Sequence, residues 1–141
     1  AYGYPAVLAV VSSWLDVPEG GTVDYGGTPV PRGKFVSWDE IRRMQASGLV
    51  EIASHSHDLH RVVTTTPQGN SGPAARSWAF DPAAGQREGD TAHRARVHAD
   101  LMHARARIAA ETGRSPRAVR RRHRAADAGT GARSEPPRPG R

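Results

Sequence analysis

Cysteine is absent from the 141 residues of this chain, so neither disulfides nor thiolate metal ligands are available. Long hydrophobic runs are absent too: no stretch of about 18 consecutive apolar residues occurs, and the sequence predicts no membrane span. The apolar residues 6–11 follow no basic segment, so we expect a core strand there, buried on both faces, and no signal peptide. These absences leave histidine and carboxylate side chains as the principal candidate metal ligands.

Positive charge is concentrated at the C-terminal end. The formal net charge is +6, but residues 114–141 carry nine arginines against two acidic residues, and the rest of the chain is almost neutral. Residues 119–141 contain no aromatic side chain on which a base could stack and are rich in proline and glycine. We therefore expect a domain at residues 1–118 followed by a disordered basic tail, and we expect no nucleic acid as partner. The alternative, a basic nucleic-acid-binding protein, predicts binding that weakens steeply with salt.

One α/β unit can be predicted from local signals. Ser37 and Glu40 have the spacing of a capping box, which predicts a helix from Trp38 to about Ser47 with Gly48 as its left-handed terminator. Residues 49–53, apolar except for Glu51, follow at once and predict a strand. A strand that ends in a polar loop after such a helix is typical of folds that bind ligands at the carboxyl ends of their strands.

The second half of the chain predicts a long loop and one more helix. Residues 61–90 contain several glycines and prolines and are expected to form the loop. A helix is expected over residues 91–112, with Asp90 as cap and Gly113 as terminator. Its apolar side chains recur at steps of three and four and form a narrow stripe of Val97, Leu101, Ala104 and Ile108.

A cluster of three histidines and one aspartate follows the predicted strand. His55, His57, Asp58 and His60 lie within residues 54–60. Neutral imidazole binds Zn²⁺, Ni²⁺, Co²⁺ or Fe²⁺, and such a metal activates water and polarises a carbonyl group. The cluster therefore indicates a metal site. The alternative is a polar surface loop in which one histidine is hydrogen-bonded to Asp58.

Other histidines and the tryptophans are weaker candidates. His93, His98 and His103 recur every five residues, so successive rings point roughly 140° apart around a helix and cannot converge on a metal. We expect them at the surface. The three tryptophans could stack on sugar rings or simply pack in the fold, and the sequence leaves both open: Trp14, Trp38 and Trp78.

The motif His55-Ser56-His57-Asp58-Leu59-His60 resembles that of polysaccharide deacetylases with a NodB-homology domain, carbohydrate esterase family 4. The likeness is greatest to the branch that de-N-acetylates poly-β-1,6-N-acetyl-D-glucosamine in biofilm exopolysaccharide export. It covers roughly residues 1–118 and extends through residues 4–8, 13–14, 23–27, 35–39, 44–51 and 67–70. The resemblance implies part of a deformed (β/α) barrel, a poly-N-acetylglucosamine substrate and a location in the periplasm or cell envelope.

The same resemblance implies roles for the motif residues. A divalent metal (Zn, Ni, Co or Fe) would be held by His55 and His60 together with an aspartate. Ser56 would shape the loop, and Asp58 would orient an imidazole from behind. His57 has no implied role, and its side chain is expected to face solvent. The implied reaction is hydrolysis of the N-acetyl group by metal-bound water.

Two features of the family pattern are not matched. The family's Asp-Asp pair, which supplies a metal ligand and the general base, lies upstream of the segment that matches residue 1. Its Pro-Tyr-Gly strand is replaced here by the arginine-rich residues 120–124. We therefore expect a fragment from a truncated or frame-shifted reading frame, with a weakly held metal and little deacetylase activity. A remnant that binds carbohydrate without catalysis is the alternative.

Overall fold

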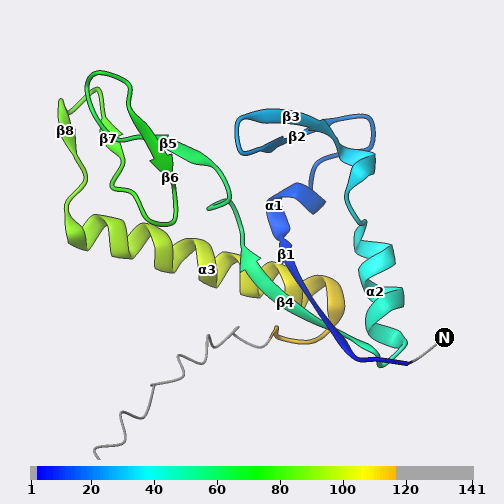
Figure 1. Cartoon of the computed structure of the whole chain (residues 1–141). Coiled ribbons are helices and arrows are strands. Elements are labelled where there is room, and N and C mark those ends of the chain that lie inside the picture. Colours follow the sequence, from blue (N-terminus) through cyan, green and yellow to red (C-terminus); the bar gives the residue numbers. More distant parts are fainter. Residues whose placement is uncertain (1–2, 117–141) are drawn as a thin grey trace, which may run out of the picture.

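The computed structural model describes residues 3–116, and the expected disordered tail at residues 119–141 lies outside this range. The elements, drawn in Figure 1, are β1 (Ala6–Val11), α1 (Ser12–Leu15), β2 (Thr22–Tyr25), β3 (Thr28–Pro31), a 3-10 turn η1 (Arg32–Lys34), α2 (Trp38–Ala46), β4 (Val50–Ser56), β5 (Val62–Thr64), β6 (Ser71–Pro73), β7 (Phe80–Asp81), β8 (Gln86–Arg87) and α3 (Asp90–Thr112). Neither of the longer helices in the described range is apolar enough to cross a membrane.

The centre of the fold is the parallel pair β1–β4. Ala6 lies opposite Val50, and a shift of register after Val10 places Val11 opposite Ser56. Helices α2 and α3 both pack against β4, so the α/β unit expected from the sequence is confirmed. β4 is longer than expected, however. It continues to Ser56, so the first residues of the histidine motif belong to the strand itself.

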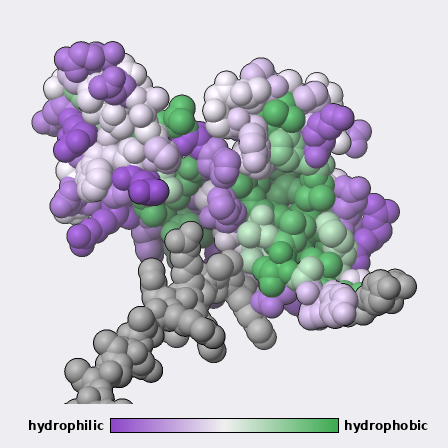
Figure 2. All heavy atoms as spheres, in the orientation of Figure 1, coloured by the Kyte–Doolittle hydropathy of each residue, from purple (hydrophilic) through white to green (hydrophobic). Residues whose placement is uncertain are grey.

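The expectation that β1 is buried on both faces is wrong. Val10 and Val11 are buried, but Val7 is 63% exposed and the first residues of the strand face outward. Within the described residues β1 pairs with β4 alone, so its other edge is open. Figure 2 shows apolar atoms gathered at the surface over β1 and under the β2–β3 hairpin.

Helix α2 begins as expected. The Ser37 hydroxyl accepts a hydrogen bond from the backbone N–H of Glu40, and the Glu40 carboxylate accepts one from the backbone N–H of Ser37. This reciprocal capping box fixes the first turn. The chain then leaves the helix at Gly48, whose φ of 72° is the left-handed conformation that favours glycine. The apolar face of α2 meets α1, α3 and the central strands in a core of Val10, Leu15, Trp38, Ile41, Ile52 and Ile108.

Helix α3 differs from expectation at its N-terminus. Asp90 is its first helical residue and does not cap it; the cap position is Gly89, and the Asp90 carboxylate accepts a hydrogen bond from Trp78 Nε1 at 2.9 Å. Gly113 terminates the helix as expected, with φ of 69°. The apolar stripe is buried only in its C-terminal half: Ala104 and Ile108 are fully buried, whereas Leu101 is 44% exposed.

Residues 61–90 do not form the loop that was expected. They contain two short antiparallel hairpins, β5–β6 and β7–β8. Arg96 of α3 holds both: its guanidinium donates to the Ala74 and Ser77 carbonyls at 2.9 and 3.0 Å and pairs with Glu88 at 2.5 Å. Polar backbone and ion-pair contacts therefore fix this segment, which explains why its hydrophobic pattern did not predict strands.

Candidate metal and substrate site

His55 and His60 lie together at the carboxyl end of β4. His55 stands near the end of the strand, His60 lies in the loop that follows, and their ring centroids are 5.3 Å apart. Both rings line a cavity of about 370 Å³ bounded below by the apolar residues of β1. The structure thus places the two predicted ligands side by side at an accessible strand end, where a metal and a substrate can both reach them.

Aromatic side chains form the wall of this cavity around His60. The Trp14 ring meets His60 nearly edge-on, with centroids 5.0 Å apart, and Tyr25 lies 5.4 Å from the same imidazole. Phe35 packs against Trp14 at 5.1 Å. The sequence left the role of Trp14 open and did not indicate Tyr25. The Gly26-Gly27 pair beside Tyr25 signals a hairpin turn, but it does not show over which strand end the hairpin lies.

His57 is not turned to solvent as expected. Its Nδ1 lies 2.9 Å from the buried Ser12 Oγ, within hydrogen-bond distance, and its ring stacks on His103 with centroids 4.0 Å apart. Its backbone N–H donates to Asp100 of α3 at 2.8 Å. His57 therefore joins the motif to α1 and α3, a role that no local sequence pattern indicates because the partners are more than 40 residues away.

The two residues expected to support the ligands are placed differently. The Asp58 carboxylate is 52% exposed and pairs with Arg61 at 2.8 Å, not with an imidazole. Ser56 is 2% exposed, and its hydroxyl has no hydrogen-bond partner within the described residues. The alternative of a histidine hydrogen-bonded to Asp58 is likewise not seen. Among residues 3–116 no group of three histidine, aspartate or glutamate side chains converges as a metal site.

Trp38, Trp78 and His93 take part in packing away from the histidine pair. Trp38 belongs to the core, and Trp78 stacks on His93 with centroids 4.8 Å apart. The expectation that His93 lies at the surface is wrong, because its side chain is only 14% exposed and lies 3.2 Å from the Glu88 carboxylate. His98 and His103 are exposed as expected. Of the three tryptophans, Trp14 alone lines the cavity beside the histidine pair.

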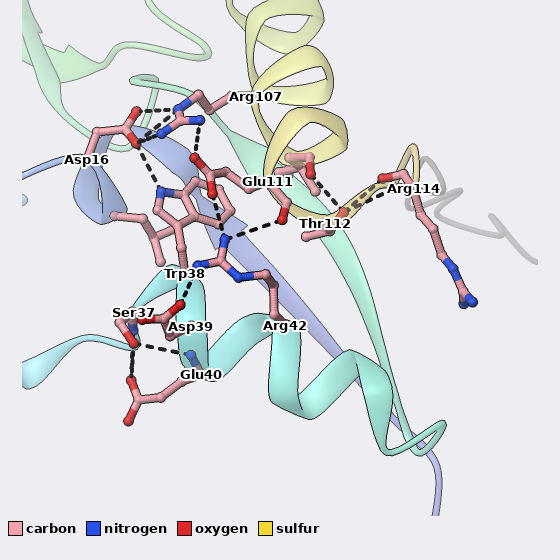
Figure 3. Close-up of polar contacts among 12 residues, drawn as sticks. Asp16, Ser37, Trp38, Asp39, Glu40, Arg42, Arg107, Glu111, Thr112 and Arg114 are labelled. Atoms are coloured by element: carbon pink, nitrogen blue, oxygen red, sulfur yellow. Dashed lines mark hydrogen bonds and ion pairs between the residues drawn. The ribbon is translucent and has the colours of Figure 1, made fainter.

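An ion-pair network joins the end of α1, which carries Trp14, to helices α2 and α3 (Figure 3). The Arg107 guanidinium donates to Asp16 at 2.8 Å and to Glu111 at 2.5 Å, and Arg42 of α2 donates to the other oxygen of Glu111 at 2.7 Å. Trp38 Nε1 donates to Asp16 at 3.0 Å. Burial raises the pKa of Asp16, but the hydrogen bonds from Arg107 and Trp38 outweigh it, and the net pKa is lowered.

The structure defines an α/β domain with a histidine pair at the carboxyl end of a parallel strand. The family model described as polysaccharide deacetylase matches residues 1–134. The chain belongs to the polysaccharide deacetylase family.

Individual relatives agree with this assignment. The chain is 32% identical over 102 residues to the poly-β-1,6-N-acetyl-D-glucosamine N-deacetylases of Escherichia coli K12 and O157:H7, a match that covers 72% of this chain and 15% of each enzyme. Among solved structures, the BpsB deacetylase domain of Bordetella bronchiseptica shares 48% identity over 81% of this chain and 44% of that chain, with a TM-score of 0.75. The de-N-acetylase of Aggregatibacter actinomycetemcomitans shares 40% identity over 82% and 44%, with a TM-score of 0.74.

These likenesses confirm the expected α/β deacetylase-type fold. The chain spans 15% of the curated relatives and under half of the solved chains, so it corresponds to a part of each.

Proposed function

We propose that this chain carries the metal-binding histidine segment of an N-deacetylase that acts on poly-β-1,6-N-acetyl-D-glucosamine in the cell envelope, as part of biofilm matrix metabolism. The pairing of His55 with His60 in one cavity, 5.3 Å between ring centroids, is the observation that carries the proposal. The names of the Escherichia coli relatives support the substrate class, and those of the solved structures support deacetylation.

The residues present fit two positions of a metal site. Both donors are imidazoles on a rigid strand end and its loop, a donor type suited to Zn²⁺, Ni²⁺, Co²⁺ or Fe²⁺. When bound, a divalent metal supplies Lewis-acid polarisation of the acetamide and activation of water. Catalytic sites usually use three protein ligands, so with two histidines we expect weak metal affinity.

The aromatic wall is suited to a sugar. Tyr25 is 50% exposed at the cavity, and Trp14 is half-buried beside it. Faces and edges of aromatic rings bind the apolar surfaces of pyranose rings. We propose that these two side chains orient an N-acetylglucosamine unit so that its acetamide faces His55 and His60.

Isotope-labelled protein titrated with a β-1,6-linked N-acetylglucosamine oligomer tests the substrate. The indole N–H signal of Trp14 should shift saturably while that of Trp78 stays in place, and a β-1,6-linked glucose oligomer should shift neither. Tyr25→Ala should weaken the binding, whereas the matched variant Tyr4→Ala, outside the cavity, should not. Equal shifts with both oligomers would contradict the proposed recognition of the acetamide.

A carbohydrate-binding remnant without catalysis is the second candidate, favoured by the lack of a third converging ligand among residues 3–116. Acetate release separates the two. We expect the 141-residue chain to release little acetate even with added Zn²⁺ or Co²⁺, because no described residue beside the histidine pair is placed as general base. Substantial release that His55→Ala abolishes would show that this expectation is wrong.

A further inference from the structure

The carboxylate of Asp100 binds the middle of the histidine motif through two backbone hydrogen bonds. Asp100 lies on α3, and its Oδ1 accepts from the backbone N–H of His57 at 2.8 Å while its Oδ2 accepts from that of Asp58 at 2.6 Å. Hydrogen bonds to an ionised carboxylate are shorter and stronger than those between neutral groups. Both oxygens are thus committed to adjacent peptide groups of one short loop.

The two bound N–H groups lie between the proposed metal ligands. β4 ends at Ser56, and His55 lies within the strand between Ser54 and Ser56, which both pair with β1, whereas His60 follows in the loop. The path of the loop at residues 57 and 58 therefore sets where His60 lies relative to His55. A loop that has left its strand also has backbone donors that need partners, and Asp100 supplies them.

The opposite side of the same loop is bound by α1. The backbone N–H of Ser13 donates to the His57 carbonyl at 3.2 Å, and the fully buried Ser12 hydroxyl lies 2.9 Å from His57 Nδ1. On α3, His103 lies three residues beyond Asp100 and stacks on the His57 ring. The loop is therefore held between two helices, and Asp100 supplies the carboxylate that binds its backbone.

We infer that Asp100 is a positioning residue of the histidine site: it fixes the loop so that His60 stays beside His55 before any metal binds. The inference rests on the proposed function, because it assigns the held geometry to metal binding. Side chains that orient metal ligands from behind typically change metal affinity 10- to 100-fold when they are removed. Ligands that are already held in place lose less conformational freedom when a metal binds, which favours affinity.

Asp100→Asn tests the inference. The amide keeps the shape of the side chain but turns an NH₂ group toward a backbone N–H, so at least one hydrogen bond and the negative charge are lost. We expect exchange of the His57 and Asp58 amide protons to accelerate while core amides of α3 do not change. The dissociation constant for Co²⁺, measured at a temperature where both proteins are folded, should rise about 10- to 100-fold. The visible spectrum of bound Co²⁺ should change with the ligand geometry.

Two further variants separate positioning from folding. Asp90→Asn makes the same charge change on the same helix away from the loop and should leave loop exchange and Co²⁺ affinity unchanged. Asp100→Glu retains a carboxylate on a longer side chain. It should restore part of the protection of the loop amides from exchange and part of the Co²⁺ affinity.

Wild-type loop exchange or wild-type Co²⁺ affinity in Asp100→Asn would overturn the inference, while the proposed function would stand. If the wild-type chain itself binds no Co²⁺, the proposed function fails instead, and the assignment of Asp100 to it falls as well.

Discussion

The indole of Trp14 meets the imidazole of His60 nearly edge-on, with ring centroids 5.0 Å apart and planes inclined at 73°. This contact joins α1, which follows β1, to the loop that follows β4. Because the two strands are parallel neighbours, their carboxyl ends bring residues 46 positions apart into one site. The position of His60 in the histidine pair therefore depends on its contact with α1 as well as on the strand β4 that it follows.

Removal of the Trp14 ring should disturb His60 specifically. Trp14→Ala is expected to shift the His60 ring signals in NMR spectra and to lower the free energy of unfolding by about 1–3 kcal/mol, since a half-buried aromatic contact is lost. Trp14→Phe retains an aromatic edge and should shift them less. Trp78→Ala, in the β7–β8 region, is the control and should leave His60 unmoved. An unchanged His60 signal in Trp14→Ala would refute the contact.

The Arg107–Asp16 ion pair should make stability depend on acid pH. The pKa of Asp16 is lowered in the folded protein, so its ionised carboxylate stabilises the fold fully at pH values above the ordinary aspartate pKa of 3.8. That stabilisation is lost as the pH falls through the lowered pKa. Arg107→Met should lower the free energy of unfolding by about 1–2 kcal/mol at neutral pH, allowing for partial solvent exposure. Urea unfolding between pH 7 and 3 measures this. Arg105→Met, an exposed arginine on the same helix, should behave as wild type; equal losses in both would argue against the pair.

The Glu88–Arg96 ion pair, in the hairpin region, should make a second acid-dependent contribution to the free energy of unfolding. Arg96 holds the pKa of Glu88 at about 2, below its ordinary 4.5. Stability from this pair is complete above about pH 4.5 and is lost as the pH falls from there toward 2. Glu88→Gln should lower the free energy of unfolding by roughly 1–3 kcal/mol at pH 7. It should also make that free energy depend less steeply on pH below about pH 4.5. The exposed Glu19→Gln serves as control. A wild-type pH dependence in Glu88→Gln would contradict the assignment.

Replacing side chains of α3 with alanine should lower the free energy of unfolding only where the helix packs against the core beside β4. Ile108 is fully buried in the core, so Ile108→Ala is expected to cost about 2–4 kcal/mol of unfolding free energy. Met102 on the outward side is 47% exposed, and Met102→Ala should change stability by less than about 0.5 kcal/mol. Thermal and urea unfolding of both variants check this. Similar losses in the two would show that the C-terminal half of α3 does not pack as described.

Local signals predicted the local parts of the fold. The capping box at Ser37 and Glu40 and the glycine terminators at Gly48 and Gly113 each depend on residues within one helical turn, and all are confirmed. The proximity of His55 and His60 also follows from position, since both lie at one strand end. Their role as metal ligands stays a prediction.

Long-range partners could not be predicted in the same way. Ser12 reaches His57 across 45 residues, and Asp100 reaches the same residue across 43. No periodicity links such pairs. The hairpins between residues 61 and 90 were missed for a related reason: their strands are two or three residues long and are held by Arg96, not by an alternating apolar face. β1 was expected to be buried because its sequence is apolar throughout, but burial on both faces needs elements packed over each face, and the first residues of β1 are exposed.

The most direct test of the account is a Co²⁺ titration of the wild-type chain beside His55→Ala, His60→Ala and His98→Ala. We expect weak binding of one ion per chain that is lost in the first two variants and kept in the third, because His98 is exposed on α3 away from the cavity. Binding that survives both His55→Ala and His60→Ala, or a wild-type chain that binds no Co²⁺, would contradict the assignment of this histidine pair as a metal site.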